Sequence, residues 1–270
     1  MIDLLFDIPL LLAVGVAAGL LAGLLGIGGG VIIVPALIFL FEHQGMKAPH
    51  ILPTAIGTSL ATIVLTSLSS ARAHQERGAI QWPTVRRIAA GLVLGAPAGA
   101  WLASVLPGQV LRMLFALFLL IVAVKLWWQP AQLTEQQPAL RGNALFPAAG
   151  FVIGAVSSFF GIGGGTLSVP FLSWCNMPLK RAVASSAAIG VVISLFGVLG
   201  YIVTGWRAGD MPSLNVGYIN LPAWFGITIT SVFFAPLGAK LAHRMSPLIL
   251  RRLFSTLLVG VSIKLMSNLL

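Results

Sequence analysis

Long apolar stretches, separated by short connections that carry the charges, are the main pattern of this 270-residue sequence. We distinguish eight stretches, four in each half of the chain. They cover residues 8–41, 50–71, 88–106, 110–128, 142–179, 182–206, 211–239 and 247–270. A helix needs about 20 apolar residues to cross the hydrocarbon core of a bilayer, and these stretches approach or exceed that length. The pattern therefore predicts an all-α integral membrane protein.

The first stretch of each half is too long for one simple crossing, and it contains three consecutive glycines. As one helix, the 34 residues from Ile8 to Phe41 would be about 51 Å long, whereas the hydrocarbon core is about 30 Å thick. Gly28–Gly30 lies inside this stretch, and Gly163–Gly165 lies inside its counterpart. Each glycine costs a helix about 1 kcal/mol relative to alanine. We therefore expect, in each half, a discontinuous or re-entrant segment followed by three transmembrane helices.

An internal repeat relates the two halves. The segment 26–35 reappears as 161–170, with Gly-Ile-Gly-Gly-Gly and Val-Pro at the same positions. Three further pairs of segments recur in the same order: 55–60 with 182–187, 96–100 with 235–239, and 111–126 with 250–265. This order predicts an N-terminal repeat, a linker and a C-terminal repeat that together form one transmembrane unit. Their expected bounds are 1–128, 129–141 and 142–270.

Composition and charge narrow the class further. Hydrophobic residues make up 58% of the chain and charged residues 8%, against about 25% charged in a typical soluble protein. This composition excludes a soluble enzyme, a disordered tail and a secreted disulfide scaffold. Cys175 is the only cysteine, so no disulfide within the chain is possible. Sixteen Lys and Arg against six Asp and Glu give a net charge of +10. We attribute this excess to cytoplasmic loops facing a lipid bilayer, not to a nucleic-acid partner.

The distribution of the basic residues favours two inverted halves. If the glycine-containing segments return to the side from which they enter, only four of the sixteen basic residues face the outside. These are Lys47, Arg112, Arg207 and Lys264. Such a bias is normal for cytoplasmic loops, and it leaves three crossings per half, an odd number that inverts the second half relative to the first. Inverted repeats with discontinuous helices are a recurrent design of secondary transporters, with the substrate near the midplane between the repeats.

The two glycine motifs are the main candidates for a binding site. A break between helices leaves backbone N–H groups unpaired and directs helix N-termini toward the gap, which suits an anion. The candidate residues are Gly28, Gly29 and Gly30 in the first half and Gly163, Gly164 and Gly165 in the second. The alternative is that these glycines only allow close helix packing. The duplication, with a proline five residues after each triplet, favours a site.

Two pairs of hydroxyl residues in the second apolar stretch of each half could complete the hydrogen bonding of an anion. They are Thr58, Ser59, Ser185 and Ser186. Equally, membrane Ser and Thr residues often bond the carbonyl one turn earlier or bridge helices. His74 and Thr166 are accessory candidates, and a histidine at the end of an apolar stretch is also compatible with a position at the membrane interface. No Asp or Glu lies deep in a stretch, which argues against proton or sodium coupling through a buried carboxylate.

Other features indicate packing, and none indicates catalysis. Gly91, Gly95 and Gly99 form a small-residue face on one helix, as expected for close contact with a neighbouring helix. The hydroxyl residues lack a His or Asp positioned to activate them inside the bilayer, so no catalytic residue and no enzyme activity is predicted. No metal site and no cofactor is predicted either. The sequence leaves the oligomeric state open.

Taken together, the paired Gly-Ile-Gly-Gly-Gly segments with their trailing Val-Pro, the element Ile56-Gly57-Thr58-Ser59 and His74 with Gly78-Ala79-Ile80 resemble the TauE/SafE sulfite exporter family of bacterial membrane permeases. The resemblance runs from about residue 10 to 265. It implies a multi-pass protein of the bacterial inner membrane that moves small organosulfur anions. Ala184-Ser185-Ser186 departs from the Gly-Thr-Ser form of the first half.

The resemblance therefore predicts an exporter of sulfite, sulfoacetate or related sulfonates that works by alternating access between inverted halves. The alternatives are an anion channel and a permease for another small oxyanion or carboxylate, including thiosulfate uptake. Thiosulfate-uptake relatives rely on several cysteines, and the single Cys175 departs from that pattern.

Overall fold

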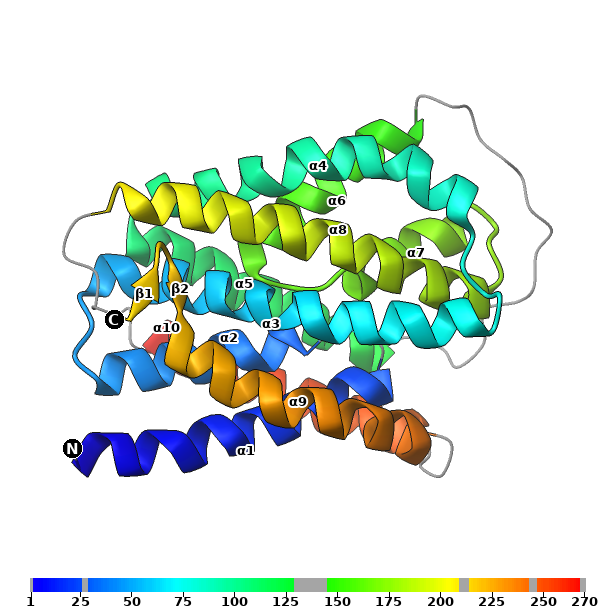
Figure 1. Cartoon of the computed structure of the whole chain (residues 1–270). Coiled ribbons are helices and arrows are strands. Elements are labelled where there is room, and N and C mark those ends of the chain that lie inside the picture. The colour runs from blue at the N-terminus through cyan, green and yellow to red at the C-terminus, as the bar shows by residue number, and fades with distance from the viewer. Residues whose placement is uncertain (1, 26–28, 129–144, 209–213, 243–246, 268–270) are drawn as a thin grey trace.

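The computed structural model describes residues 2–25, 29–128, 145–208, 214–242 and 247–267. In these ranges the chain forms ten α-helices and one short hairpin (Figure 1). The first half contributes α1 (Ile2–Leu25), α2 (Gly30–His43), α3 (Ala48–Glu76), α4 (Trp82–Val105) and α5 (Gly108–Trp128). The second half contributes α6 (Leu145–Phe160), α7 (Gly165–Trp174), α8 (Leu179–Trp206), β1 (Asn215–Val216), β2 (Ile219–Asn220), α9 (Leu221–Ala242) and α10 (Pro247–Ser267).

The helices form one elongated bundle in which neighbours mostly come from different halves (Figure 1). α3 packs against α8, α4 against α6, α1 against α9 and α5 against α10. The loop between α2 and α3 and the hairpin lie at one end of the bundle, whereas the α3–α4 and α7–α8 connections lie at the other end. The linker expected at 129–141 lies outside the described residues.

The glycine motifs interrupt the first apolar stretch of each half. Gly29 caps α2 with a φ of 71°, a left-handed conformation that favours glycine. In the second half, Gly161 follows α6 with a φ of 65°, and α7 begins at Gly165. Each long stretch is therefore divided into two helices at its glycine motif.

Glycine faces let α4 and α6 approach closely. A Cβ added at Gly91, Gly95 or Gly99 would overlap the backbone of α6. Close contact was the role expected for these three glycines. The pair α1 and α9 is built in the same way, because a Cβ at Gly15 or Gly19 would overlap the backbone of α9 around Ile227 and Ser231.

The apolar surface supports the membrane assignment. The described residues contain four helices that are long and apolar enough to cross a bilayer: Ala48–Glu76, Trp82–Val105, Gly108–Lys125 and Lys180–Trp206. Large apolar side chains such as Leu94 and Phe233 point outward, with 69% and 73% of their surface exposed. Because a water-soluble surface rarely exposes so many large apolar groups, this outer face suits lipid contact. The prediction of a helical, multi-pass membrane protein is confirmed.

The start of α9 shows the largest difference between a helix boundary and the sequence prediction. Within the apolar stretch expected from residue 211, the described residues 214–220 are not helical, and α9 starts at Leu221. Before it, β1 and β2 pair antiparallel, with Val216 opposite Ile219 and a turn at Gly217, whose φ is 57°. Apolar residues therefore occur here in a partly buried hairpin, which a count of apolar positions cannot distinguish from helix.

Candidate functional site

The two glycine breaks touch each other in the middle of the bundle. A Cβ added at Gly30 would overlap the carbonyl oxygen of Gly161 and lie 2.9 Å from Cδ1 of Ile63. The Ser59 hydroxyl donates a hydrogen bond to that same Gly161 oxygen, at 3.0 Å. The structure thus brings together Gly29, Gly30 and Ser59 with the start of the second break. Gly28 lies outside the described residues.

The second glycine motif rests on α8. Gly163 and Gly164 are buried, and Gly165 is half-buried. A Cβ on Gly164 would lie 2.8 Å from the Gly190 nitrogen and 2.9 Å from the Ser186 carbonyl oxygen. This contact requires glycine at position 164. Because the first N–H groups of a helix have no acceptor within it, α2 and α7 both begin with backbone donors at their breaks.

Thr58 and Ser185 play matching parts in opposite halves. The Thr58 hydroxyl oxygen accepts a hydrogen bond from the backbone N–H of Asn220, at 3.0 Å. The Ser185 hydroxyl oxygen accepts one from the backbone N–H of Gln81, also at 3.0 Å. Asn220 directly precedes α9 and Gln81 directly precedes α4. Each hydroxyl therefore fixes the start of a helix that belongs to the other half.

The hairpin covers Thr58. Tyr218 is buried and packs edge-on against Tyr201, with ring centroids 6.4 Å apart. A Cβ on Gly57 would overlap the Tyr218 carbonyl oxygen, so glycine at position 57 lets the hairpin reach α3. Burial raises the pKa of the Tyr218 phenol, which therefore stays neutral beside Thr58 at physiological pH.

The remaining predicted residues occupy different surroundings. The Ser186 hydroxyl donates to the Val183 carbonyl at 2.8 Å, the local bond that was the alternative to ligand binding. Thr166 lies in the first turn of α7, and its hydroxyl is buried with no hydrogen-bond partner in the described part of the chain. His74 is half-buried in the last turn of α3, beside Arg77. No described contact joins His74 to the glycine breaks.

The buried polar side chains of the described residues are uncharged. Leaving the tyrosines aside, the buried polar side chains of the described residues are all Ser or Thr, and no ionisable carboxylate, lysine or arginine is among them. The same ranges contain no group of three His, Cys, Asp or Glu side chains that could hold a metal ion. The interior therefore offers neutral hydrogen-bond donors and helix N-termini, a combination that favours an anion over a cation.

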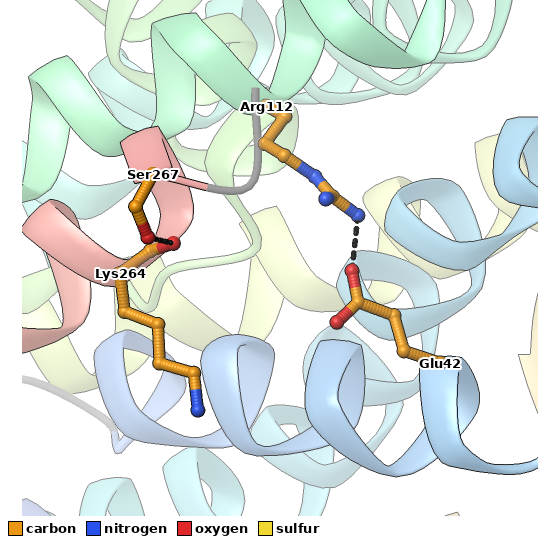
Figure 2. A network of polar contacts seen from close by, with 4 residues as sticks. All are labelled: Glu42, Arg112, Lys264 and Ser267. Atoms are coloured by element: carbon orange, nitrogen blue, oxygen red, sulfur yellow. Dashed lines mark hydrogen bonds and ion pairs between the residues drawn. The ribbon is translucent and has the colours of Figure 1, made fainter. Parts of the chain in front are cut away.

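Two contacts of basic side chains join α2 to neighbouring helices. Arg112, at the start of α5, donates to the Glu42 carboxylate in the last turn of α2 (Figure 2). Lys264 lies nearby on α10, and its ammonium group is 3.8 Å from the ring centre of Phe39. Ser267 donates to the Lys264 carbonyl in the last turn of α10. These contacts tie α2 to α5 and α10 and leave the interior uncharged.

Sequence reasoning missed several residues of this region. The matching glycines Gly15 and Gly150, and Gly19 and Gly154, recur at the same spacing of 135 residues as the glycine motifs, so a search for all repeated glycines would have found them. The partners of the two hydroxyls are backbone groups of remote loops. No side-chain pattern identifies them in advance.

Comparison with known proteins defines the family. A family model described as "Sulfite exporter TauE/SafE" matches residues 11–265. The chain belongs to the TauE/SafE family. The resemblance seen in the sequence is thereby confirmed.

Individual TauE/SafE relatives match this chain over most of both lengths and are named as membrane transporters. A probable membrane transporter protein of Haemophilus influenzae is 37% identical over 262 residues, which cover 96% of this chain and 97% of the relative. One from Methanocaldococcus jannaschii is 30% identical over 259 residues, with coverages of 95% and 94%. The protein YunE of Bacillus subtilis, also named a probable membrane transporter, is 28% identical over 255 residues, with coverages of 87% and 89%. No solved structure matches this chain.

These comparisons establish a membrane transporter of the TauE/SafE family. Its relatives are named as transporters and not as enzymes, in agreement with the sequence prediction. The apolar helices of the described residues make it a multi-pass membrane protein.

Proposed function

We propose that this transporter exports small organosulfur anions, such as sulfite, sulfoacetate or related sulfonates, across the bacterial inner membrane by alternating access between two inverted halves. One observation carries the proposal: two glycine breaks from different halves touch inside a bundle whose buried polar groups are neutral hydroxyls. The family description, a sulfite exporter, supports the choice of substrate class.

The arrangement of the helices supports two equivalent halves. In order, each half has two helices joined at a glycine motif and then three further helices. The cross-half contacts correspond as well: α4 meets α6 as α9 meets α1. In Figure 1, α2 ends at the end of the bundle where α1 begins, which fits a segment that enters and returns. Thr58 and Ser185 add a matching pair of hydrogen bonds.

The chemistry of the interior supports an anion. Hydroxyl and backbone N–H donors form strong hydrogen bonds to negatively charged oxygens, and an apolar surrounding strengthens them. They add no fixed charge in the bilayer, where a buried charged side chain would be costly. An inside-negative membrane potential assists anion export by about 2.3 kcal/mol per charge per 100 mV, so an exporter does not require a coupling ion.

The test is transport by the purified protein in proteoliposomes. Labelled sulfite and sulfoacetate are expected to cross only in liposomes that contain the protein, and faster when the potential drives the anion outward. Taurine is the matched control, because it keeps the sulfonate but carries an ammonium group that needs acceptors. The proposed substrate class fails if neither anion crosses, or if taurine crosses as fast as sulfoacetate.

A further inference from the structure

Most buried hydroxyls of the described residues have a hydrogen-bond partner within the protein. Ser186 and Ser194 donate to carbonyl oxygens three and four residues earlier in α8. Ser255 and Ser262 donate from α10 to carbonyl oxygens of α5, at 2.7 and 2.8 Å. Buried hydroxyls are normally satisfied in this way, so an exception calls for an explanation.

Three serines beside the second glycine break are such exceptions. Ser157 and Ser158 lie in the last turn of α6, and Ser168 lies in the first turn of α7. All three side chains are fully buried, and none of their hydroxyl oxygens has a hydrogen-bond partner in the described part of the chain. A buried hydroxyl without a partner is unfavourable, and a ligand oxygen that accepts its hydrogen would remove that cost.

The carbonyl oxygens of Ser157 and Ser158 already accept hydrogen bonds, whereas their hydroxyls have no partner in the described part of the chain. The Ile162 and Gly161 N–H groups donate to the Ser157 and Ser158 carbonyls, at 2.9 and 3.3 Å. These bonds close α6 with the left-handed Gly161, as in a Schellman motif. The Tyr201 hydroxyl also donates to the Ser158 carbonyl, at 3.2 Å. The Ser158 hydroxyl itself faces α8, where a Cβ on Gly197 would lie 2.7 Å away.

Ser168 approaches the break from the other side. Its N–H donates to the Gly164 carbonyl at 2.8 Å, which places it one turn into α7. Because side chains of an α-helix lean toward its N-terminus, the Ser168 hydroxyl leans toward the break and toward the free N–H groups of that first turn. The neighbouring Thr166 hydroxyl is also buried and without a partner.

The corresponding positions of the first half carry no hydroxyls. The residues 135 positions before the three serines are Ala22, Gly23 and Ile33. None of them can donate a hydrogen bond from its side chain. The two motifs therefore share their glycines, whereas the side chains at the matching positions around them differ.

We propose that Ser157, Ser158 and Ser168 bind the oxygens of the transported oxyanion at the second glycine break, while the first break serves as its packing partner. This one-sided site rests on the proposed transport of small oxyanions. It adds three binding residues to the glycine motif of the second half.

The test measures sulfite binding by thermal stabilisation of the purified protein in detergent. Ser157→Ala, Ser158→Ala and Ser168→Ala are compared, singly and together, with Ser255→Ala and Ser262→Ala, which remove hydroxyls that have protein acceptors. Without sulfite, the first three variants are expected to melt at or above the wild-type temperature, because they remove unpaired groups. The two control variants are expected to melt below it.

With sulfite, each of the three serine variants is expected to bind at least about tenfold more weakly than the wild type, and the controls to bind like the wild type. If the wild type and the triple variant bind sulfite equally well, the one-sided site is wrong and the proposed transport function stands. If sulfite and sulfoacetate neither stabilise the wild type nor cross the membrane of the proteoliposomes, the proposed function and the proposed serine site are both wrong.

Discussion

Replacing Gly30 with alanine tests whether the contact between the two glycine breaks matters for transport. Gly30 has no left-handed conformation, so the effect of the new methyl group comes from its neighbours. The methyl would overlap the Gly161 carbonyl oxygen and lie 3.1 Å from the Ser59 hydroxyl oxygen. To reach a close C···O distance of about 3.3 Å, the breaks must separate by roughly 1 Å.

The expected size of the effect follows from these contacts. Overpacking a filled interior costs about 1–3 kcal/mol. Loss of the hydrogen bond between Ser59 and Gly161 adds about 1 kcal/mol, and the better helix propensity of alanine returns less than about 1 kcal/mol. We therefore expect Gly30→Ala to lower the free energy of unfolding by about 1–4 kcal/mol. We expect the transport rate per folded molecule to fall at least about tenfold, because the breaks no longer meet.

The assay combines thermal unfolding in detergent with labelled-sulfite transport in proteoliposomes, normalised to the amount of reconstituted protein. Gly260→Ala in α10 is the matched control, because a Cβ there meets nothing within 4 Å. This control is expected to transport normally and to be stabilised by up to about 1 kcal/mol. If Gly30→Ala transports at the wild-type rate and normal abundance, contact between the breaks has no part in transport.

Two further changes probe the contacts between the halves. Thr58→Val leaves the partly buried Asn220 N–H without its acceptor and is expected to lower the free energy of unfolding by about 1–3 kcal/mol. Thr228→Val is the control, because it removes a hydroxyl without a described partner and is expected to leave the free energy of unfolding unchanged. Equal effects of the two variants would contradict this reasoning. Arg112→Met breaks the partly buried ion pair with Glu42 and is expected to cost about 1–3 kcal/mol in the same measurement. The charge-reversed double variant, Glu42→Arg with Arg112→Glu, is expected to recover part of that loss, and no recovery would argue against a stabilising pair.

The sequence predicts the helical architecture well because its signals are local or repeated. Apolar length locates the helices, and the glycine triplets locate the interruptions near Gly30 and Gly165. The hairpin at Asn215–Asn220 could not be predicted in this way. It lies inside an apolar stretch, and its contacts are with Tyr201 and Gly57, which are far away in the sequence.

The candidate site is predictable in position and less so in chemistry. The glycine motifs and hydroxyl pairs identify the region, and the structure brings Ser59 to the second break. Sequence reasoning did not separate hydroxyls that fix backbone from hydroxyls that remain available. Thr58 and Ser157 look alike as residues in apolar helices, yet one accepts a remote N–H and the other has no described partner. That difference depends on which loop folds against which helix.

The described contacts also separate what the two halves share from what they do not. Thr58 and Ser185 perform the same task in both halves, because each half must fix the start of a helix from the other half. The side chains beside the breaks differ, because the second break has Ser157 and Ser168 where the first has Ala22 and Ile33. In the proposed mechanism, alternating access requires two halves that pack with similar energies, whereas a single small anion requires only one set of donors. A symmetric scaffold around a one-sided site meets both requirements.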